Sequence, residues 1–350
     1  MMERMPSTRL EHPHELADPE ALAAILGPVA ELRREPMEAP GFTGARFERL
    51  SLRLGDGALR KLVLKRARLD SDWTAWRTAD AFGRAALPLD EPALAGIWEV
   101  YACPYVAHAV ADGEVGLLMD DVGPYLLPDV RQPLEEASED LLVDSLARLH
   151  ARFWNASELD NPRLAAPARV LGMLGPRHAR ELGTSDGLAP VVERARRGWE
   201  FAFQHLPASI VTRLSQPPED IVGAWGPLPR TLLHGDTKVA NFAILPDGKV
   251  AAFDWGCLSA GPAAIDLGWY LAVNASRIRG PKESFVARYR QRLEAALIAR
   301  LSEGSWSALV SAAVESGAML LLWSKALALE RGGASARAEW DWWVEQLAGA

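Results

Sequence analysis

The sequence predicts a bilobal α+β fold, in which a small antiparallel β-rich part precedes a larger, mainly helical part. Three observations lead to this prediction. Apolar residues alternate with a period of two along several segments of residues 41–120, as half-buried strands require. After a proline-rich connector that begins near residue 121, apolar residues recur mostly at helical spacing. The length of 350 residues also exceeds one ordinary core, so we divide the chain into residues 1–120 and 121–350.

The composition limits the classes of partner. Asp and Glu number 46 and Lys and Arg 38, which gives a net charge of −8; this favours a cationic ligand over nucleic acid. Cys103 and Cys257 lie too far apart for a zinc ribbon. The N-terminus lacks an apolar signal-peptide core, and the longest apolar run, residues 317–323, is shorter than the roughly 20 residues of a membrane span. We therefore expect a cytoplasmic protein with no nucleic-acid or membrane partner.

The first predicted element is a helix that begins after Asp18, a residue type that caps helices. Apolar residues then recur at helical spacing as far as Leu32. We expect Gly27-Pro28 to kink or split this helix and Pro36 to end it, because proline removes a backbone donor and clashes with the preceding turn.

Four strands and one helix are predicted in the rest of the first part. Residues 47–54 and 60–67 alternate in polarity around an Asp-Gly turn, which predicts a hairpin. Residues 70–86 read as a helix. Residues 97–108 and 114–120 form a second pair of strands around another Asp-Gly turn.

Helices dominate the predicted second part. We expect one over residues 138–154 and a helical tail over residues 307–347, with short strands between residues 231 and 254. Residues 183–187 match the G-x-S-x-G pattern of serine hydrolases. That pattern requires a buried strand before it, whereas the preceding residues are charged and helix-like, so we expect no hydrolase.

A predicted hairpin in residues 231–256 brings polar side chains together. Residues 246–248 (Pro-Asp-Gly) form a turn signal between two apolar runs. A hairpin centred between the last two of these residues pairs Asn241 with Asp254 at its open end. Asp236 lies five residues before Asn241, close enough for a loop to bring it to the same place.

These residue types suit phosphate chemistry. Mg²⁺ prefers oxygen ligands and uses few protein groups, so Asn241 and Asp254 fit a magnesium site. Asp236 would remain free to accept a proton from an attacking hydroxyl, and Lys238 would place a positive charge beside a phosphate in transfer. The alternative for Asn241 and Asp254 is that they bond only to backbone at the hairpin end.

Residues His234-Gly235-Asp236, Asn241 and Asp254-Trp255-Gly256 resemble the motifs of the aminoglycoside phosphotransferase and choline kinase-like family, whose fold is protein-kinase-like. The resemblance implies that Asp236 is the catalytic base, and that Asn241 and Asp254 hold Mg²⁺. It also implies ATP, or GTP, as the phosphate donor. We expect His234 to orient the loop.

The resemblance continues upstream of these motifs. Lys65 matches the third-strand lysine that contacts the α- and β-phosphates, and it faces away from Leu62 and Leu64 on its strand. A Gly-Phe-Thr-Gly stretch at residues 41–44 occupies the place of the loop over the phosphates, and residues 117–121 resemble the strand and hinge whose backbone binds adenine. The resemblance thus implies nucleotide contacts for Lys65, Phe42, Thr43, Gly44, Met119, Asp120 and Val122.

Some positions support or depart from the family pattern. Asp266 matches an aspartate that braces the catalytic loop, so it is expected to have a structural role. The family usually has His or Ser where this chain has Lys238, and its phosphate loop has three glycines rather than two. No glutamate in residues 70–86 is available to pair with Lys65.

The resulting hypothesis is a small-molecule kinase that transfers the γ-phosphate of ATP or GTP to a substrate alcohol, with Mg²⁺ as cofactor. Families with these motifs phosphorylate aminoglycosides, macrolides, choline-like alcohols, sugars and amino-acid hydroxyls, and the sequence does not choose among them. The first alternative is a pseudokinase or nucleotide-binding scaffold without turnover. A protein kinase is disfavoured because the chain has no H-R-D or A-P-E segment.

Overall fold

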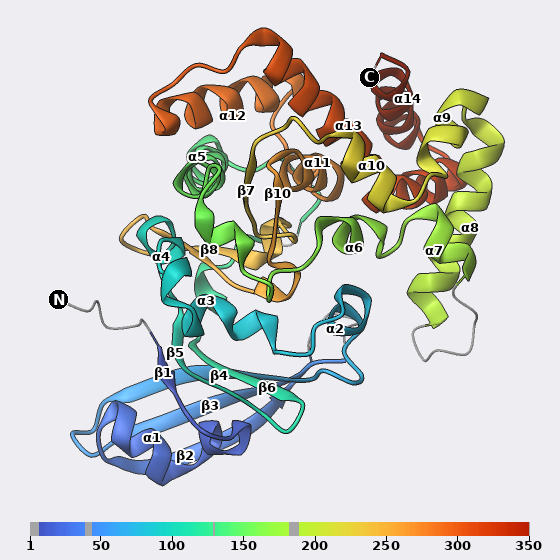
Figure 1. Ribbon diagram of the computed structural model, residues 1–350. Coiled ribbons are helices and arrows are strands. Elements are labelled where there is room, and N and C mark those ends of the chain that lie inside the picture. Colours follow the sequence, from blue (N-terminus) through green and yellow to red (C-terminus); the bar gives the residue numbers. More distant parts are fainter. Residues whose placement is uncertain (1–6, 39–43, 129, 182–188, 350) are drawn as a thin grey trace. The chain divides into compact units, whose positions relative to one another are not determined.

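The computed structural model describes residues 7–38, 44–128, 130–181 and 189–349 (Figure 1). The strands are β1 (Thr8–Arg9), β2 (Val29–Met37), β3 (Arg46–Leu54), β4 (Leu59–Arg68), β5 (Tyr105–Ala111), β6 (Glu114–Asp120), β7 (Arg230–Leu233), β8 (Phe242–Ile244), β9 (Val250–Ala252) and β10 (Ser259–Pro262). The α-helices are α1 (Pro19–Leu26), α2 (Trp73–Thr78), α3 (Leu87–Asp90), α4 (Ile97–Val100), α5 (Glu136–Arg152), α6 (Pro167–Gly172), α7 (Pro176–Glu181), α8 (Ala189–His205), α9 (Ala208–Leu214), α10 (Pro218–Ala224), α11 (Ala264–Val273), α12 (Lys282–Leu297), α13 (Glu303–Arg331) and α14 (Ala334–Gly349). The 3-10 turns are η1 (Pro13–Ala17), η2 (Arg84–Ala86), η3 (Pro92–Leu94), η4 (Gly123–Tyr125), η5 (Ser157–Asp160), η6 (Val239–Asn241) and η7 (Trp255–Cys257).

The chain divides into two compact units. The first unit comprises Met1–Pro128 and Ala240–Cys257, and the second comprises Asp129–Val239 and Leu258–Ala350. The predicted division at residue 120 left 121–350 as one continuous part, so the structure differs by moving the segment around β8 and β9 into the first unit.

The first unit contains a six-stranded sheet with the order β1-β5-β6-β4-β3-β2. β1 pairs in parallel with β5, and all other neighbours are antiparallel. The predicted hairpin of residues 47–54 and 60–67 is therefore confirmed, with small changes in its ends, and the predicted strand over residues 114–120 is confirmed as β6. This sheet places Lys65 and Met119 on neighbouring strands, β4 and β6.

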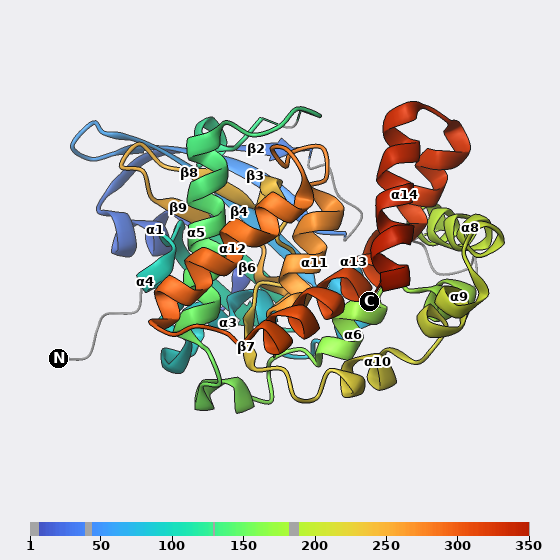
Figure 2. The ribbon, with the colours of Figure 1, turned by 90° about the horizontal axis from the view of Figure 1, so that it is seen from above.

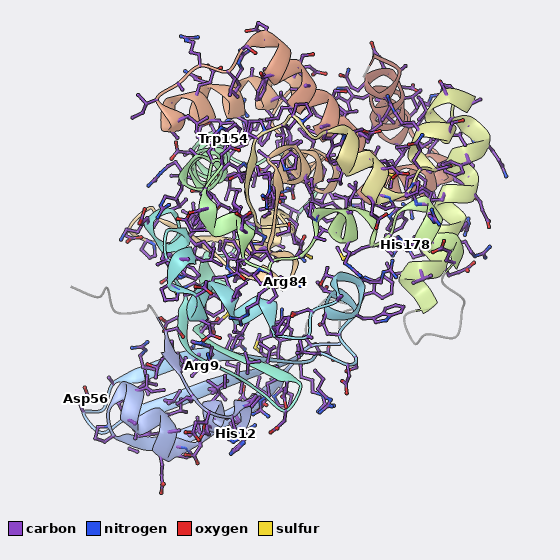
Figure 3. All side chains as sticks on the ribbon, in the orientation of Figure 1. Arg9, His12, Asp56, Arg84, Trp154 and His178 are labelled. Atoms are coloured by element: carbon purple, nitrogen blue, oxygen red, sulfur yellow. The ribbon has the colours of Figure 1, made fainter. Side chains whose placement is uncertain are left out.

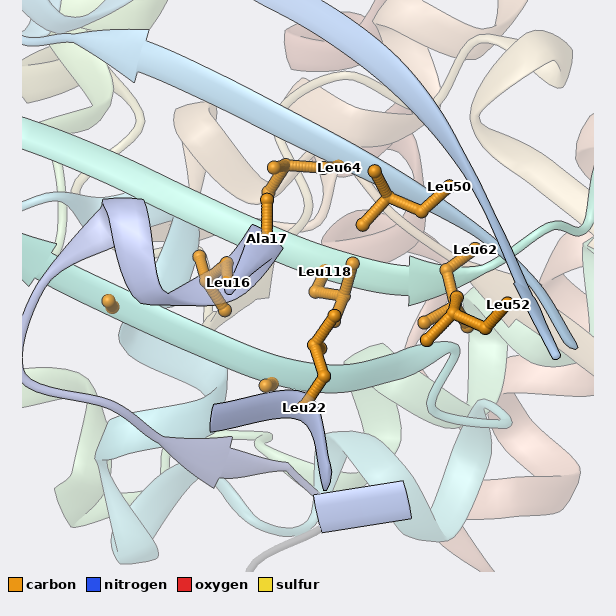
Figure 4. Close-up of a cluster of buried hydrophobic side chains, with 10 residues drawn as sticks. Leu16, Ala17, Leu22, Leu50, Leu52, Leu62, Leu64 and Leu118 are labelled. Atoms are coloured by element: carbon orange, nitrogen blue, oxygen red, sulfur yellow. The ribbon is translucent and has the colours of Figure 1, made fainter. Parts of the chain in front are cut away.

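One face of this sheet packs against η1 and α1. Leu62 and Leu64 on β4 are fully buried there, together with Leu50 and Leu52 on β3 (Figure 4). Because side chains alternate along a strand, Lys65 lies on the opposite face of β4, as predicted from the sequence.

The first predicted helix is shorter than expected. α1 ends at Leu26, and Gly27 follows with a φ of +92°, a conformation that favours glycine. Residues from Val29 onward then form β2, whereas the sequence predicted that the helix continued. β2 is an edge strand, where a proline such as Pro36 is tolerated because the outer side needs no partner.

Two further predictions in this region were only partly correct. The helix expected over residues 70–86 is present only as α2 and the short turn η2. α2 ends at Ala79, which has a φ of +52°. The strand expected over 97–108 starts at Tyr105, and residues 97–100 form the short helix α4 instead.

The β8–β9 hairpin has a register one residue away from the predicted one. Leu245 donates to the carbonyl of Lys249 at 2.9 Å, so the loop has three residues. Gly248 closes it with a φ of +82°, as three-residue hairpin loops require. Asn241 therefore aligns with Phe253, whose N–H donates to the Asn241 carbonyl at 3.2 Å, and the predicted pairing of Asn241 with Asp254 was wrong.

Contacts explain why this hairpin belongs to the first unit. The N–H of Ala102 donates to the carbonyl of Val250 at 2.9 Å. Ala243 and Ala251 pack with Val122 in a small buried cluster. No local pattern predicts these contacts, because they join segments more than a hundred residues apart.

The second unit is mainly helical, as predicted (Figure 2). The helix expected over residues 138–154 is confirmed as α5, which packs against α12. α11 and α13 cross at Gly268 and Gly317, where an added Cβ at Gly268 would lie 2.1 Å from the carbonyl oxygen of Ala313. Glycine is therefore required at this crossing, and α11 is held firmly in place.

α13 is the one described helix that is long and apolar enough to cross a membrane, with a mean hydropathy of 1.4 over 18 residues. However, 56% of that stretch is buried inside the structure. Mostly buried core helices of soluble proteins have the same properties, so this helix is weak evidence for a membrane span.

Candidate active site

The loop that follows β7 is anchored by one buried carboxylate. Asp266, on α11, is fully buried. Its Oδ2 accepts the backbone N–H of His234 and its Oδ1 accepts that of Gly235, both at 2.8 Å. Gly235 has a φ of +77°, so the chain turns sharply before Asp236. Asp266 therefore binds the backbone of this loop at two successive residues.

A second buried residue, which was not predicted from the sequence, contacts Asp266. His150 on α5 lies with Nε2 3.3 Å from Asp266 Oδ2 and Nδ1 2.6 Å from the hydroxyl of Tyr289. His150 is fully buried. Its position four residues after Leu146, on the apolar face of the predicted helix, was the available signal.

Two side chains hold the carboxylate of Asp236. The Lys238 ammonium donates to Oδ2 at 2.8 Å, and the indole N–H of Trp269 donates to Oδ1 at 2.9 Å. The backbone N–H of Asp236 also donates to His234 Nδ1 at 3.2 Å. Trp269 was not predicted from the sequence, although it lies three residues after Asp266, one helical turn away.

Asn274 fixes the backbone on both sides of Lys238. Its Oδ1 accepts the N–H of Val239 and its Nδ2 donates to the carbonyl of Thr237, both at 2.9 Å. Asn274 follows the last residue of α11 and is buried. The same helix therefore anchors the loop at three places, through Asp266, Trp269 and Asn274.

In the first unit, Lys65 is paired with Asp254. The ammonium lies 2.8 Å from Asp254 Oδ1, and the side chains are 14% and 35% exposed. The Lys65 ammonium also lies 5.7 Å from the centre of the Phe47 ring. Asp254 has a φ of +69°, which is uncommon for a residue with a side chain and tends to occur at functional sites.

Asp72 adds a second carboxylate to the surroundings of this pair. It caps α2 by accepting the N–H of Ala75 at 2.9 Å. Burial raises the pKa of Asp72; Lys65 opposes this effect, and the charge of Asp254 adds to it. The sequence offered no glutamate to pair with Lys65, and in the structure its partner is Asp254, with Asp72 close enough to act electrostatically.

Asn241 and Asp254 have the donor chemistry of a magnesium site. Asn241 is buried and its backbone aligns with Phe253, the neighbour of Asp254. An amide oxygen and a carboxylate are hard ligands, and Mg²⁺ commonly uses only one or two protein ligands beside phosphates and water. Among the described residues, no group of three or more His, Cys, Asp or Glu side chains can hold a metal. Asn241 and Asp254 therefore fit a magnesium site that has only two protein ligands.

A buried arginine braces the segment after Asp254. Arg84, labelled in Figure 3, is 3% exposed and donates to Thr78 Oγ1 at 2.7 Å and to the carbonyl of Gly256 at 3.4 Å. Burial lowers the pKa of Arg84, against the opposing charge of Asp80. This link between α2 and η7 was not predicted, because nothing local in the sequence connects Arg84 to residues 172 positions later.

The predicted adenine-binding segment lies at the end of β6. Met119 is buried and pairs with Val63 and Tyr105 on the two neighbouring strands. Asp120 forms an ion pair with Arg60 at 2.7 Å, and Val122 lies in the small cluster described above. Their nucleotide contacts stay predictions.

The predicted phosphate loop is covered only in part. Gly44 has a φ of +88°, and Phe42 and Thr43 lie outside the described residues. Residues 183–187, which match the hydrolase pattern, also lie outside them.

Three acidic residues late in the chain have cationic partners within the second unit. Glu315 lies 3.4 Å from Arg213. Glu339 lies 3.1 Å from Lys325, and Asp341 lies 2.9 Å from Arg337. These carboxylates therefore act within the second unit.

The chain passes from the second unit to the first between Val239 and Ala240. Within the second unit, the structure brings together Asp236, Lys238, His234 and Asp266. Within the first, it brings together Lys65 and Asp254, and aligns Asn241 with the residue before Asp254.

Comparisons with known proteins agree with the resemblance. A family model described as the phosphotransferase enzyme family (APH) matches residues 41–303, most of the chain. A comparison with curated proteins gives no match.

Several solved structures share the fold. An ethanolamine kinase from Plasmodium vivax has a TM-score of 0.51 and 10% identity, covering 93% of this chain and 84% of that one. A choline kinase from Cryptosporidium parvum has a TM-score of 0.50 and 10% identity, covering 90% and 88%. A spectinomycin phosphotransferase solved with ADP and spectinomycin has a TM-score of 0.50 and 10% identity, covering 95% and 92%. At these identities the similarity concerns the fold, and it confirms the predicted kinase-like α+β architecture.

Proposed function

The chain belongs to the phosphotransferase enzyme family, and we propose that it transfers the γ-phosphate of ATP, or GTP, to the hydroxyl of a small molecule. The observation that carries this proposal is the Asp236 carboxylate. It is held by two donors at 2.8 and 2.9 Å, on a loop that the buried Asp266 fixes. Such a group has the geometry of an oriented base.

In this proposal Asp236 accepts the proton of the acceptor hydroxyl as the oxygen attacks phosphorus. Its position is fixed before the substrate arrives, because Asp266 and Asn274 hold the loop from both ends. Lys238 lies beside Asp236 and is 38% exposed, so its ammonium can reach a phosphate oxygen and offset the negative charge there.

The first unit supplies the nucleotide contacts in this proposal. Lys65 contacts the phosphates, the backbone at Met119, Asp120 and Val122 binds the base, and the segment ending at Gly44 covers the phosphates. Asn241 and Asp254 would hold Mg²⁺, which neutralises phosphate charge when bound. Lys65 is paired with Asp254 in the structure, so the lysine turns from this carboxylate toward phosphate when nucleotide binds.

The acceptor is proposed to be a small hydroxyl-bearing compound. The spectinomycin phosphotransferase, the choline kinase and the ethanolamine kinase with this fold act on such compounds according to their names. A cationic acceptor was favoured by the net charge, but Glu315, Glu339 and Asp341 have cationic partners within the second unit. Cytoplasmic location and the lack of nucleic-acid and membrane partners remain part of the proposal.

The test is a phosphate-transfer screen with ATP and GTP over aminoglycosides, macrolides, amino alcohols and sugars. Asp236→Asn keeps the size of the side chain and removes the base, so turnover is expected to fall by about 10²–10⁴-fold while stabilisation by nucleotide and Mg²⁺ is retained. Asp160→Asn, an exposed aspartate paired with Arg230, is the control. Equal turnover in Asp236→Asn would sink the assignment. Nucleotide binding with no product from any acceptor would favour the scaffold alternative.

A further inference from the structure

We propose that Lys282 and Lys325 form a subsite for an anionic group of the acceptor, so that the chain prefers hydroxyl compounds that carry a carboxylate over neutral and cationic ones. This inference rests on the proposed function, in which Asp236 is the base for the acceptor hydroxyl. It adds the chemical class of the acceptor and the residues that recognise it.

The subsite is built around one carboxylate that serves two lysines. Glu339, on α14, lies with Oε1 3.1 Å from the ammonium of Lys325 on α13, and with Oε2 2.5 Å from that of Lys282, the first residue of α12. The indole N–H of Trp343 also donates to Oε1 at 2.9 Å. Both oxygens of Glu339 therefore have donors, and this group of charges has one positive charge in excess.

The pKa of Lys325 shows that the excess charge is not compensated. Burial lowers this pKa; Glu339 opposes the effect, and the charge of Lys282 adds to it. Because the pKa is lowered overall, one shared carboxylate does not make up for the burial of the ammonium. The next carboxylate on α12, Glu283, is exposed and accepts the indole N–H of Trp342 at 2.6 Å. A second anion beside the lysines would supply the missing charge.

The lysines are largely buried, yet a ligand can reach them from solvent. Their side chains are 10% and 14% exposed, and that of Glu339 is 20% exposed. The Lys282 ammonium lies 4.4 Å from the centre of the Trp342 ring, so the indole covers one side of it. Lys325 donates on its inner side to the carbonyl of Ala272 at 2.7 Å. In such a partly desolvated place, a bound anion is attracted more strongly than it is by exposed lysines.

One helix, α11, joins this subsite to Asp236. Trp269 donates to Asp236 Oδ1 at 2.9 Å, and Ala272, whose carbonyl accepts from Lys325, lies three residues further along α11. Three residues rise about 4.5 Å along a helix, so the distance from the Asp236 carboxylate to Lys325 is on the order of 10 Å. A chain of about six carbon atoms, with one hydrogen bond at each end, spans such a distance.

A purely structural role would need only one of the two lysines. Lys325 caps the carbonyl of Ala272 near the end of α11 and forms an ion pair with Glu339. Lys282 is not needed for that pair, and it brings the charge that is in excess. Replacing Lys282 therefore separates anion recognition from support of the fold.

The first experiment measures binding without turnover. Gluconate, sorbitol and glucamine share one polyol chain and carry a carboxylate, a hydroxyl and an ammonium at its end. Calorimetric titration of the full chain without nucleotide should give a Kd for gluconate about 10–100-fold below that for sorbitol, the effect of one hydrogen bond between charged groups. Glucamine should bind more weakly than sorbitol, and added salt should reduce the advantage of gluconate. Equal affinities for gluconate and sorbitol, or no binding of any of the three, would overturn the proposal.

The second experiment assigns the preference to Lys282. Lys282→Met removes the excess charge and leaves the pair of Lys325 with Glu339, so the advantage of gluconate should disappear, whereas Lys282→Arg keeps the charge and should retain it. Lys282→Gln replaces Lys282→Met if the latter does not fold. The matched control is Arg337→Met, which removes an exposed arginine paired with Asp341 on the same helix as Glu339 and should keep the full advantage. An unchanged advantage in Lys282→Met or Lys282→Gln would overturn the proposal.

Phosphate transfer separates this inference from the proposed function. Lys282→Met should raise KM for gluconate with kcat within about twofold, because the lysine binds a part of the acceptor that does not react. Product from neutral or cationic acceptors but not from anionic ones would overturn this inference and leave the proposed function standing. Gluconate binding that depends on Lys282, with no product from any acceptor, would refute the proposed function and leave the anion subsite standing.

Discussion

Replacing Asp266 with asparagine tests whether one buried carboxylate holds the loop that carries Asp236. Both oxygens of Asp266 accept backbone N–H groups, from His234 and Gly235, at 2.8 Å. Asparagine keeps the size of the side chain but replaces one acceptor oxygen with an NH₂ group. In either orientation of the amide, its NH₂ group therefore faces the backbone N–H of His234 or of Gly235, and no hydrogen bond can form there.

The cost follows from the burial of the group. Asp266 is fully buried, so water cannot satisfy the backbone N–H that loses its acceptor. A hydrogen bond to a charged group contributes about 1.5–3 kcal/mol, and a buried donor left unsatisfied costs about 1–3 kcal/mol. The two contributions overlap and are not summed, so we expect Asp266→Asn to lower the free energy of unfolding by about 3 kcal/mol. At roughly 2–4 °C per kcal/mol for a unit of this size, Tm falls by about 6–12 °C.

Thermal unfolding and phosphate transfer are measured on the same preparations. Because Gly235 directly precedes Asp236, the displaced loop should also lower kcat at a temperature where the variant is folded, by about tenfold or more. Asp160→Asn makes the same chemical change at an exposed ion pair with Arg230 and should change stability by less than about 1 kcal/mol. The reasoning is refuted if Asp266→Asn melts within about 1 °C of the Asp160→Asn control and keeps full kcat.

Three further variants test buried or half-buried charges elsewhere. Glu339→Gln leaves the ammonium groups of Lys282 and Lys325 without their shared carboxylate and should cost about 3 kcal/mol in a denaturant titration. Asp72→Asn keeps the helix cap and removes a half-buried charge, so Tm should stay equal or rise, whereas Asp72→Ala should lose about 1 kcal/mol. Arg84→Met removes the donors to Thr78 and Gly256 and should destabilise the protein by about 1.5–3 kcal/mol in the same titration.

The Glu339 prediction also has a pH dependence with a definite sign. Burial acts to raise the pKa of Glu339, but Lys325 and Lys282 outweigh it and hold the pKa below the ordinary 4.5. A lowered carboxyl pKa stabilises the fold above the unfolded value, so this contribution is lost as the pH falls below about 4.5. The control is Glu283→Gln, which changes an exposed residue that accepts from Trp342. An equal loss of stability in Glu339→Gln and Glu283→Gln would contradict the prediction.

The remaining controls address the other two variants. For Asp72, a drop in Tm for Asp72→Asn as large as that for Asp72→Ala would show that its charge, and not only its cap, stabilises the fold. For Arg84, the comparison is Arg60→Met, an exposed arginine paired with Asp120. Equal stability of Arg84→Met and Arg60→Met would show that the buried bonds contribute little.

The strands could be predicted where polarity alternates over a short distance. β3, β4 and β6 carry such patterns between Asp-Gly turns, and they form within a few residues of the predicted ends. The first helix was extended too far because the apolar residues from Val29 to Leu32 fit a helix as well as a strand. The sheet partner, β3, decides between them, and no local pattern names that partner.

The candidate site divides in the same way. Asp236, Lys238, Asn241 and Asp254 lie in one short stretch, so residue type and spacing identify them. The residues that hold them come from elsewhere in the chain. Arg84 reaches Gly256 across 172 positions, and His150 reaches Asp266 across 116; such partners follow from tertiary packing, which spacing does not specify.

The hairpin shows how candidate site residues can be chosen with a wrong pairing in mind. We paired Asn241 with Asp254 by assuming a two-residue turn, but Gly248 adds one residue to the loop and aligns Asn241 with Phe253. In a regular strand the side chain after Phe253 would point to the opposite face. Asp254 instead leaves the strand in a left-handed conformation and reaches Lys65 at 2.8 Å. Its position depends on this single backbone turn and on the bonds around it, including that of Arg84 to Gly256. The residue types were therefore set by the chemistry, while their arrangement is set by one loop residue and one unusual φ angle.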